Sequence, residues 1–348
     1  MKNSLVRNYK NTWTKIINTM NKILYITYDF NFKKTASSRF FYDFLCENYQ
    51  VETISPDANE IIPYDQINKK NYSCIISFYY MADFSKFTCK NLIFVPMYDG
   101  FSYSFKKVLQ LKNVKIINFC KYLHKLSKSF GLLSFYIQYF PELSLNDSEE
   151  RNILFYWQRR ELSFSEIANK LPENLNELGV KKTILHSATD GNTKFIRPSE
   201  EEINKYNITI TDWFENKNEL LDLLDKTKYY IAPRMQEGIG LSFLDAMSHG
   251  CVIIANNDRT MNEYIKNTKN GYLINYSKNK RIKFHNFQTI QENSIQYFKT
   301  GREKYLNTLP ALVKFINFDT KDKSYNRLGY IIAFLYFAFK KLCRNKNK

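Results

Sequence analysis

The stretch EGIGLSFLDAMSHGCVIIAN, residues 237–256, decides the fold class of this chain. It contains a Gly-X-Gly turn at Gly238 and Gly240, a helix-like segment over 241–250 and the apolar run CVIIAN over 251–256. Glycines let a backbone turn sharply and approach a ligand closely. The first amide groups of a helix are unpaired and carry partial positive charge. The order therefore predicts a strand, a turn and a helix whose N-terminus forms an anion site at one edge of a parallel sheet.

Apolar runs of strand length recur along the chain and alternate with segments of helical periodicity. Runs that are apolar on both faces are typical of parallel strands covered by helices. The predicted strands cover 22–29, 51–55, 72–80, 91–100, 114–120, 134–141, 152–157, 181–188, 208–213, 228–233, 251–256 and 271–276. The predicted helices include 37–49, capped by Ser37 or Ser38, 121–131, ended by Gly131, 218–227 and 241–250. This series predicts a doubly wound α/β protein.

The series is interrupted at PELSLNDSEERN, residues 141–152, which has no apolar periodicity and reads as a linker. The length of 348 residues also favours two domains over one. We therefore predict an N-terminal Rossmann-like domain over 1–145, a C-terminal Rossmann-like domain over 146–310, and a helical region over 311–348 that ends in an apolar and basic tail.

Composition limits the class of protein. The mean hydropathy is −0.45, and no apolar run reaches the roughly 18 to 20 residues of a membrane-spanning helix. The net charge of +17 favours an anionic partner. Six cysteines without a CxxC pair argue against zinc and read as buried thiols of a reducing compartment. The first twenty residues have no continuous apolar segment, so we expect no signal peptide and a cytoplasmic protein.

Two acids flank the predicted anion site. Glu237 precedes the turn, and Asp245 lies about one turn into the helix. A charge-assisted hydrogen bond contributes about 1.5–3 kcal/mol, so the two carboxylates suit sugar and ribose hydroxyls on either side of a diphosphate. An exposed loop acid and an acid favoured by the helix dipole explain the same residues equally well at this level.

The stretch over 233–274 resembles the C-terminal signature of the large, mostly retaining family of bacterial glycosyltransferases with the GT-B fold. That signature joins a Pro, an EG-G turn, an acid eight positions after the Glu, a later Glu and an NG pair. Asp245 stands where the second acid is usually Glu, and Cys251 stands where Pro is common. The matching positions are Glu237, Gly238, Gly240, Leu241, Asp245, Ala246, Met247, Gly250, Glu263, Asn270 and Gly271.

The resemblance implies that the C-terminal domain binds a nucleoside-diphosphate-sugar and the N-terminal domain the acceptor. It assigns the donor sugar to Glu237 as a catalytic residue and the ribose to Asp245. The diphosphate falls to the backbone of Gly238, Ile239, Gly240 and Leu241 and to the basic pair Arg159 and Arg160, which an exposed strand end would also explain. The chain has no Asp-X-Asp, so we expect no metal and no cofactor.

The acceptor side is less well marked. Lys33, Lys34 and Arg39 follow the first strand and suit a phosphorylated acceptor, or form an ordinary basic loop. The family often has a His after the fourth strand, where this chain has Tyr98 and Asp99. We expect Tyr98 to contact the acceptor and Asp99 to act as a base or substrate anchor, although Asp before Gly also forms turns. Without that His, the implied retention of configuration stays open.

The tail places twelve apolar or glycine residues, 328–339, before Lys340, Lys341, Arg344, Lys346 and Lys348. A twelve-residue helix of about 18 Å is too short to span a bilayer. It suits the surface of an anionic membrane, or packs on the N-terminal domain. The sequence thus predicts a membrane-associated transferase acting on a polysaccharide or lipid-linked glycan. The alternatives are an epimerase or phosphorylase of the same fold, or a basic nucleic-acid-binding protein, for which no recognition motif is present.

Overall fold

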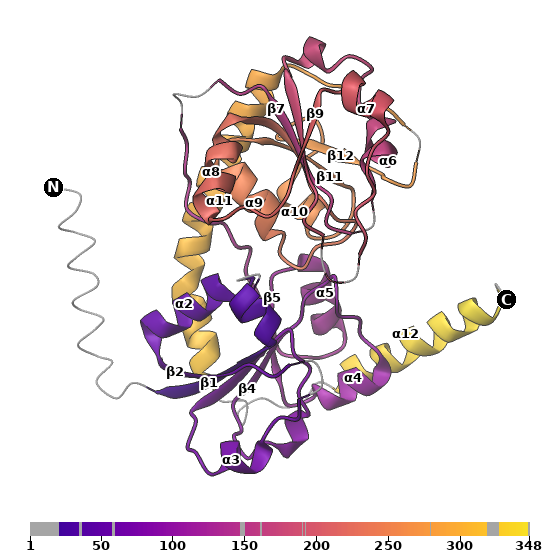
Figure 1. Cartoon of the computed structure of the whole chain (residues 1–348). Coiled ribbons are helices and arrows are strands. Elements are labelled where there is room, and N and C mark those ends of the chain that lie inside the picture. The colour runs from indigo at the N-terminus through magenta and orange to yellow at the C-terminus, as the bar shows by residue number, and fades with distance from the viewer. Residues whose placement is uncertain are drawn as a thin grey trace.

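The computed structural model describes residues 21–34, 37–57, 60–146, 150–160, 162–189, 191, 193–278, 280–318 and 327–346. The N-terminal basic segment 1–20 lies outside these residues. Two six-stranded sheets, each flanked by helices, lie one above the other, as Figure 1 shows. Every strand pair in both sheets is parallel, which confirms the predicted α/β class and the two Rossmann-like layers.

The N-terminal sheet has the strand order β2-β1-β3-β4-β5-β6. Its chain order reverses between β1 and β3, which makes the carboxyl ends of these strands a ligand-binding position in open α/β sheets. The strands are β1 (Lys22–Thr27), β2 (Gln50–Ile54), β3 (Cys74–Phe78), β4 (Leu92–Val95), β5 (Lys115–Asn118) and β6 (Ser134–Tyr136). The helices are η1 (Phe30–Lys34), α2 (Arg39–Asn48), α3 (Tyr64–Asn68), η2 (Phe84–Lys86), α4 (Phe105–Gln110) and α5 (Lys121–Ser129).

The C-terminal sheet has the order β12-β11-β10-β7-β8-β9, which is the dinucleotide-binding order with its reversal between β7 and β10. Its strands are β7 (Ile153–Trp157), β8 (Lys182–His186), β9 (Ile208–Thr211), β10 (Thr227–Ile231), β11 (Val252–Asn256) and β12 (Tyr272–Ile274). The helices are α6 (Phe164–Ala168), η3 (Leu175–Leu178), α7 (Glu200–Lys205), α8 (Lys217–Lys226), α9 (Leu241–Ser248) and α10 (Met261–Tyr264).

The twelve predicted strands all form. The central strands are buried on both faces, whereas the edge strands β2 and β6 of the N-terminal sheet contain no fully buried residue. All five residues of β11 are buried, as are all five of β3 and all four of β4. One apolar cluster continues from the N-terminal sheet through the domain boundary to α9 and β11, so the two domains share part of their core. The arrangement of the loops between them is therefore fixed by packing as well as by polar contacts.

One long helix, α11 (Phe287–Asn317), joins the two domains. It begins on the C-terminal sheet and ends on the N-terminal one, where the buried Lys115 donates hydrogen bonds to the carbonyls of Phe315 and Ile316 at 2.7 and 2.9 Å. A lysine at this end neutralises the last unpaired carbonyls of the helix. The predicted boundary between 310 and 311 falls inside α11, at Pro310.

Three local predictions differ from the structure. Ser38 is the N-cap residue of α2, but its side chain makes no capping bond and donates instead to the carbonyl of Asn31 at 3.5 Å. Among the cysteines, Cys46 and Cys343 are exposed, so not all six are buried thiols. The tail helix is longer than twelve residues: α12 runs over Arg327–Lys346, and it packs against α4 and α5.

Candidate functional site

The turn before α9 has the predicted geometry. Gly240 is the N-cap residue with φ of 87°, a left-handed conformation that favours glycine. The N-cap residue, a glycine, supplies no capping side chain, and the first amide groups of α9 lie at the edge of the sheet. A Cβ at Gly240 would lie 1.9 Å from the Phe243 ring, which leaves no room for a side chain. The sequence here therefore builds an open helix N-terminus suited to an anion.

Three of the predicted donor residues gather at the carboxyl end of β10. The charges of Arg159, Glu237 and Asp245 all act on the phenol of Tyr230, whose pKa burial raises well above its ordinary value. Arg159 leaves β7 and its guanidinium lies 4.8 Å from the centre of the Trp157 ring. Glu237 is 5% exposed. Since β7 and β10 flank the strand reversal, these side chains lie where open α/β sheets bind ligands.

Arg234 links the two domains at this site, and the sequence analysis did not single it out. Its Nη1 donates to Oδ2 of Asp99 at 2.7 Å and lies 3.8 Å from Oε2 of Glu237. The side chains of Arg234 and Asp99 are only 12% and 14% exposed. One guanidinium thus holds a carboxylate from each domain. The only sequence signal was its position three residues before Glu237.

Gly238 also has a structural role at this contact. A Cβ on Gly238 would lie 2.8 Å from Oδ1 of Asp99 and 3.0 Å from the side chain of Met97. Both neighbours belong to the loop after β4. Glycine is required here by the close approach of the N-terminal domain. Asp99 is therefore an interdomain contact in this structure, held by Arg234 and packed over Gly238.

Tyr79, directly after β3, is a second residue that sequence reasoning missed. It has φ of 65°, an unusual conformation for a bulky residue and one that tends to occur at functional sites. Burial raises the pKa of its phenol, and Asp99 raises it further, while the charges of Arg234 and Arg160 lower it. The phenol lies over Gly100, where a Cβ would clash with it. Tyr79 therefore brings the N-terminal domain to the same group of charges.

Tyr79 belongs to a group of three half-buried tyrosines. Its ring lies 5.9 Å from that of Tyr28, and the ring of Tyr80 lies 5.0 Å from Tyr28, both edge to face. Tyr28 follows β1 and the other two follow β3. These are the strands that flank the reversal of the N-terminal sheet, so the aromatic group occupies that domain's ligand-binding position.

The structure places the predicted acceptor residues at separate positions of the N-terminal domain. Arg39 forms an exposed ion pair with Asp43 at 2.8 Å on the surface of α2. Lys33 and Lys34 lie in η1, and their side chains fall outside the described structure. Tyr98 reaches across the domain boundary and donates to Asp258 at 3.4 Å, and burial, with the charge of Asp258, raises its pKa to about 12.

Glu263, one of the positions in the family signature, contacts the N-terminal domain. Its carboxylate accepts from the backbone amide of Lys121 at 2.7 Å and from the phenol of Tyr136 at 2.8 Å. Lys121 is the first residue of α5, so Glu263 places a negative charge at that helix's positive end. The residue therefore acts in this structure as a link between the domains.

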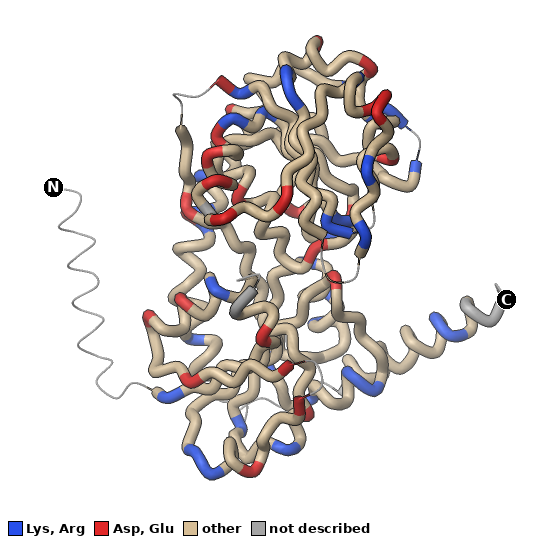
Figure 2. Tube along the Cα trace, viewed as in Figure 1, with Lys and Arg blue, Asp and Glu red and all other residues tan. Residues whose placement is uncertain are grey.

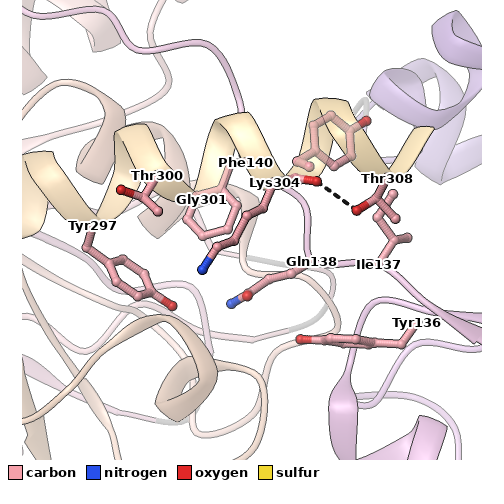
Figure 3. A pocket seen from close by; sticks show the side chains of 10 residues that line it. Tyr136, Ile137, Gln138, Phe140, Tyr297, Thr300, Gly301, Lys304 and Thr308 are labelled. Atoms are coloured by element: carbon pink, nitrogen blue, oxygen red, sulfur yellow. Dashed lines mark hydrogen bonds between the residues drawn. The ribbon is translucent and has the colours of Figure 1, made fainter. Parts of the chain in front are cut away.

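A cavity of about 250 Å³ lies at the domain boundary, apart from the group formed by Arg159, Glu237 and Asp245. Figure 3 shows it between the segment that leaves β6 and the side of α11, where Lys304 extends toward Gln138. None of the predicted donor or acceptor residues lines it. The wall residues Tyr136, Gln138 and Tyr297 make hydrogen bonds to Glu263, so this space belongs to the packing of the domain boundary.

Two further features concern the described residues only. No group of three His, Cys, Asp or Glu side chains in them is placed to hold a metal ion. None of their helices combines the length and the apolar character that crossing a membrane requires.

Comparison with known proteins finds similarity at the level of a family model and of the fold. Residues 188–285 match the family model described as glycosyl transferases group 1, which includes Glu237, the glycine turn and Asp245. A comparison of the sequence with curated proteins finds no significant match. Over these residues the C-terminal domain is therefore similar to the glycosyl transferases group 1 family.

Solved structures extend this result to both domains. A glycosyltransferase from Rickettsia africae ESF-5 aligns with a TM-score of 0.58 at 13% identity, covering 88% of this chain and 100% of that one. Sucrose-phosphate synthase from Thermosynechococcus elongatus gives 0.57 at 13%, covering 94% and 100%. Anabaena HepE in complex with UDP gives 0.56 at 12%, covering 83% and 100%. At such identities the likeness shows the fold alone, and the described residues have the GT-B fold seen in these structures.

Proposed function

We propose that this protein transfers a sugar, a hexose in the first instance, from a nucleoside diphosphate to a growing polysaccharide or lipid-linked oligosaccharide. The observation that carries the proposal is the grouping of Arg159, Glu237 and Asp245 around the end of β10, beside the open N-terminus of α9. The group 1 match covers Glu237, Asp245 and that helix. A helix N-terminus and an arginine suit a diphosphate, and carboxylates suit the hydroxyls of sugar and ribose.

In the proposed mechanism the charge of the leaving diphosphate is stabilised by the α9 amide groups and by Arg159 or Arg160. Hydrogen-bond donors that point at a developing negative charge stabilise it strongly in a site from which water is excluded. Glu237 orients the donor sugar, and Arg234, whose Nη1 lies 3.8 Å from Oε2 of Glu237, holds that carboxylate in place. No metal is needed for this step. Retention of configuration is the outcome we propose, and the anomeric form of the product tests it.

The acceptor is proposed to enter at the N-terminal domain over Tyr28, Tyr79 and Tyr80. Tyrosine presents an apolar ring and a polar hydroxyl together, which suits the mixed surface of a sugar. Asp99 lies beside this group, but in the closed arrangement its carboxylate is engaged by Arg234. If Asp99 acts as a base or anchors the acceptor, Arg234 has to release it first.

The test is a panel of nucleoside-diphosphate-sugars, with UDP-glucose first because Anabaena HepE is described in complex with it. We expect one donor to raise the melting temperature and to be hydrolysed or transferred, in the presence of EDTA as well as without it. Asp245→Asn should weaken donor binding, whereas Asp222→Asn on the neighbouring α8 should not. Wild-type transfer by Glu237→Ala would refute the site assignment.

The same assay separates the second candidate, an epimerase or phosphorylase of this fold. Release of an epimerised donor without any acceptor would identify the first, and dependence on inorganic phosphate the second.

A further inference from the structure

The C-terminal helix α12 has two apolar faces, and only one of them is covered. Ala333 is fully buried, Phe337 lies 5.4 Å from the Phe130 ring, and a Cβ at Gly329 would clash with Gly131. These residues hold α12 on the N-terminal domain. The tail therefore does pack on the N-terminal domain, as one of the two interpretations of its sequence predicted.

The opposite face of α12 is an exposed apolar stripe. Its residues recur at intervals of three, four and seven, as the side of one helix does. Ile331, Leu335 and Phe339 are 56%, 59% and 69% exposed. The full stripe is Leu328, Ile331, Ile332, Leu335, Phe339 and Leu342. A contiguous patch of this kind marks an interaction site, whereas single exposed apolar residues do not.

The surroundings of the stripe are basic. The helices α4, α5 and α12 contain no Asp or Glu, and the chain has none between Gly100 and Pro141. Figure 2 shows Lys and Arg, without acidic residues, along α4 and α12. The exposed lysines of the three helices are Lys106, Lys121, Lys125, Lys128, Lys340 and Lys341. Leu109 of α4, itself 47% exposed, adds to the apolar part.

We propose that the face formed by α4, α5 and the α12 stripe docks on an anionic lipid bilayer. An apolar stripe bordered by lysines is the pattern of a helix that lies in the membrane interface, where acyl chains take the apolar side chains and anionic headgroups the cations. A second copy of this chain is disfavoured because two surfaces without acids repel each other. Nucleic acid gives the apolar stripe no partner.

The face formed by α4, α5 and the α12 stripe lies close to residues that contact the C-terminal domain. α4 follows the loop that carries Tyr98 and Asp99, and α5 begins at Lys121, where Glu263 contacts it. A bilayer under α12 would thus lie beside the loops through which the N-terminal domain contacts the C-terminal domain. The docking inference stands without the transfer reaction. Only the use of docking, to deliver a lipid-linked acceptor to the proposed site, rests on the proposed function.

The experiment is co-sedimentation of the full chain with vesicles of phosphatidylcholine alone or mixed with phosphatidylglycerol. We expect binding to the mixed vesicles only, weakened by salt. Leu335→Glu should reduce the partition coefficient at least tenfold, and Lys340→Gln with Lys341→Gln should reduce it by about fivefold for each charge removed. The matched control is Ile196→Glu, which changes a 54% exposed residue of the C-terminal domain and should bind as the wild type does.

Three results would overturn the proposal. One is absence of wild-type binding to the mixed vesicles. Another is equal binding by Leu335→Glu and wild type. The third is a dimer, seen by size exclusion, that Leu335→Glu dissociates, because the stripe would then be an interface between copies. Donor hydrolysis in vesicle-free solution should be the same for Leu335→Glu and wild type. Loss of hydrolysis by both proteins would count against the proposed function and leave the vesicle result to decide the docking face.

Discussion

Replacing Arg234 by Met tests whether one guanidinium holds the two domains together. The substitution removes the cation that neutralises Asp99 and Glu237, whose side chains are 14% and 7% exposed. It leaves two carboxylates at a boundary that little water reaches. Breaking a buried ion pair on one side costs about 3–5 kcal/mol. We take the lower end, about 3 kcal/mol, because some water reaches Asp99.

This free energy has a measurable size. An unfolding entropy of roughly 2.1 cal/mol/K per residue over 348 residues amounts to roughly 0.7 kcal/mol/K. A loss of about 3 kcal/mol therefore lowers the melting temperature by about 4 °C, if the domains stay closed. If they open instead, water reaches Asp99, the cost is relieved, and the radius of gyration in solution scattering increases.

A double-mutant cycle separates the pair from other effects. Asp99→Asn removes one of the two charges that Arg234 holds, so Arg234→Met with Asp99→Asn should recover more than half of the loss. The coupling energy should be about 1.5–3 kcal/mol, as for hydrogen bonds to charged groups. The exposed pair Arg39–Asp43, at the similar distance of 2.8 Å, should give only about 0.3–0.5 kcal/mol in the same cycle. Wild-type melting and wild-type dimensions for Arg234→Met would refute the reasoning.

Three further predictions concern single residues. Burial lowers the pKa of His186 from 6.5 to about 4. The folded protein should therefore lose stability as the pH falls from about 6.5 to about 4, because over this range His186 is protonated only in the unfolded chain. His186→Gln should reduce this pH dependence of the free energy of unfolding, measured by urea unfolding. Glu263→Gln removes the charge at the amide of Lys121 and should cost about 1 kcal/mol in the same assay. Gly240→Ala forces a Cβ into Phe243 at φ of 87° and should cost at least about 2 kcal/mol and abolish the donor-induced rise in melting temperature.

Each of these has a matched control. His285→Gln, at an exposed histidine, should keep the pH dependence of the wild type, and an unchanged slope in His186→Gln would contradict the first prediction. Gly191→Ala changes a glycine with φ of 58° and no atom within 4 Å of the new Cβ. It should cost only about 1 kcal/mol. Equal losses at Gly191 and Gly240 would contradict the packing argument. The control for Glu263→Gln is Glu292→Gln on α11. Destabilisation of the same size by both substitutions would contradict the role given to the Glu263 charge.

The sequence predicted what local patterns determine. Each strand of the two sheets was visible as a short apolar run, and the turn at Gly240 was visible because a left-handed residue between a strand and a helix calls for glycine. The helix α11 was not predicted, because its pattern follows the surfaces of two domains in turn.

The contacts across the domain boundary could not be predicted in this way. Nothing in the run PRMQEG shows that Arg234 meets a carboxylate 135 positions earlier. Tyr79 looked like one aromatic among many at a strand end, and only its backbone angle and its neighbours distinguish it. Gly238 was predicted as a residue that lets another group approach the backbone closely, and in this structure an atom that approaches it belongs to Asp99. Such pairings depend on how the two sheets face each other.

The position of Arg234 also bears on how the two halves of the site are coupled. Asp99 belongs to the N-terminal domain and Glu237 to the C-terminal domain, and both carboxylates reach the same guanidinium nitrogen. A donor whose hydroxyls hydrogen-bond to Glu237 competes with Arg234 for that carboxylate, while Arg234 keeps Asp99. Whatever frees Asp99 for an acceptor must instead supply Arg234 with another anion. The diphosphate of a bound donor is such an anion, because its charge suits a guanidinium. Donor binding would then release Asp99, and acceptor chemistry would follow donor binding in a fixed order.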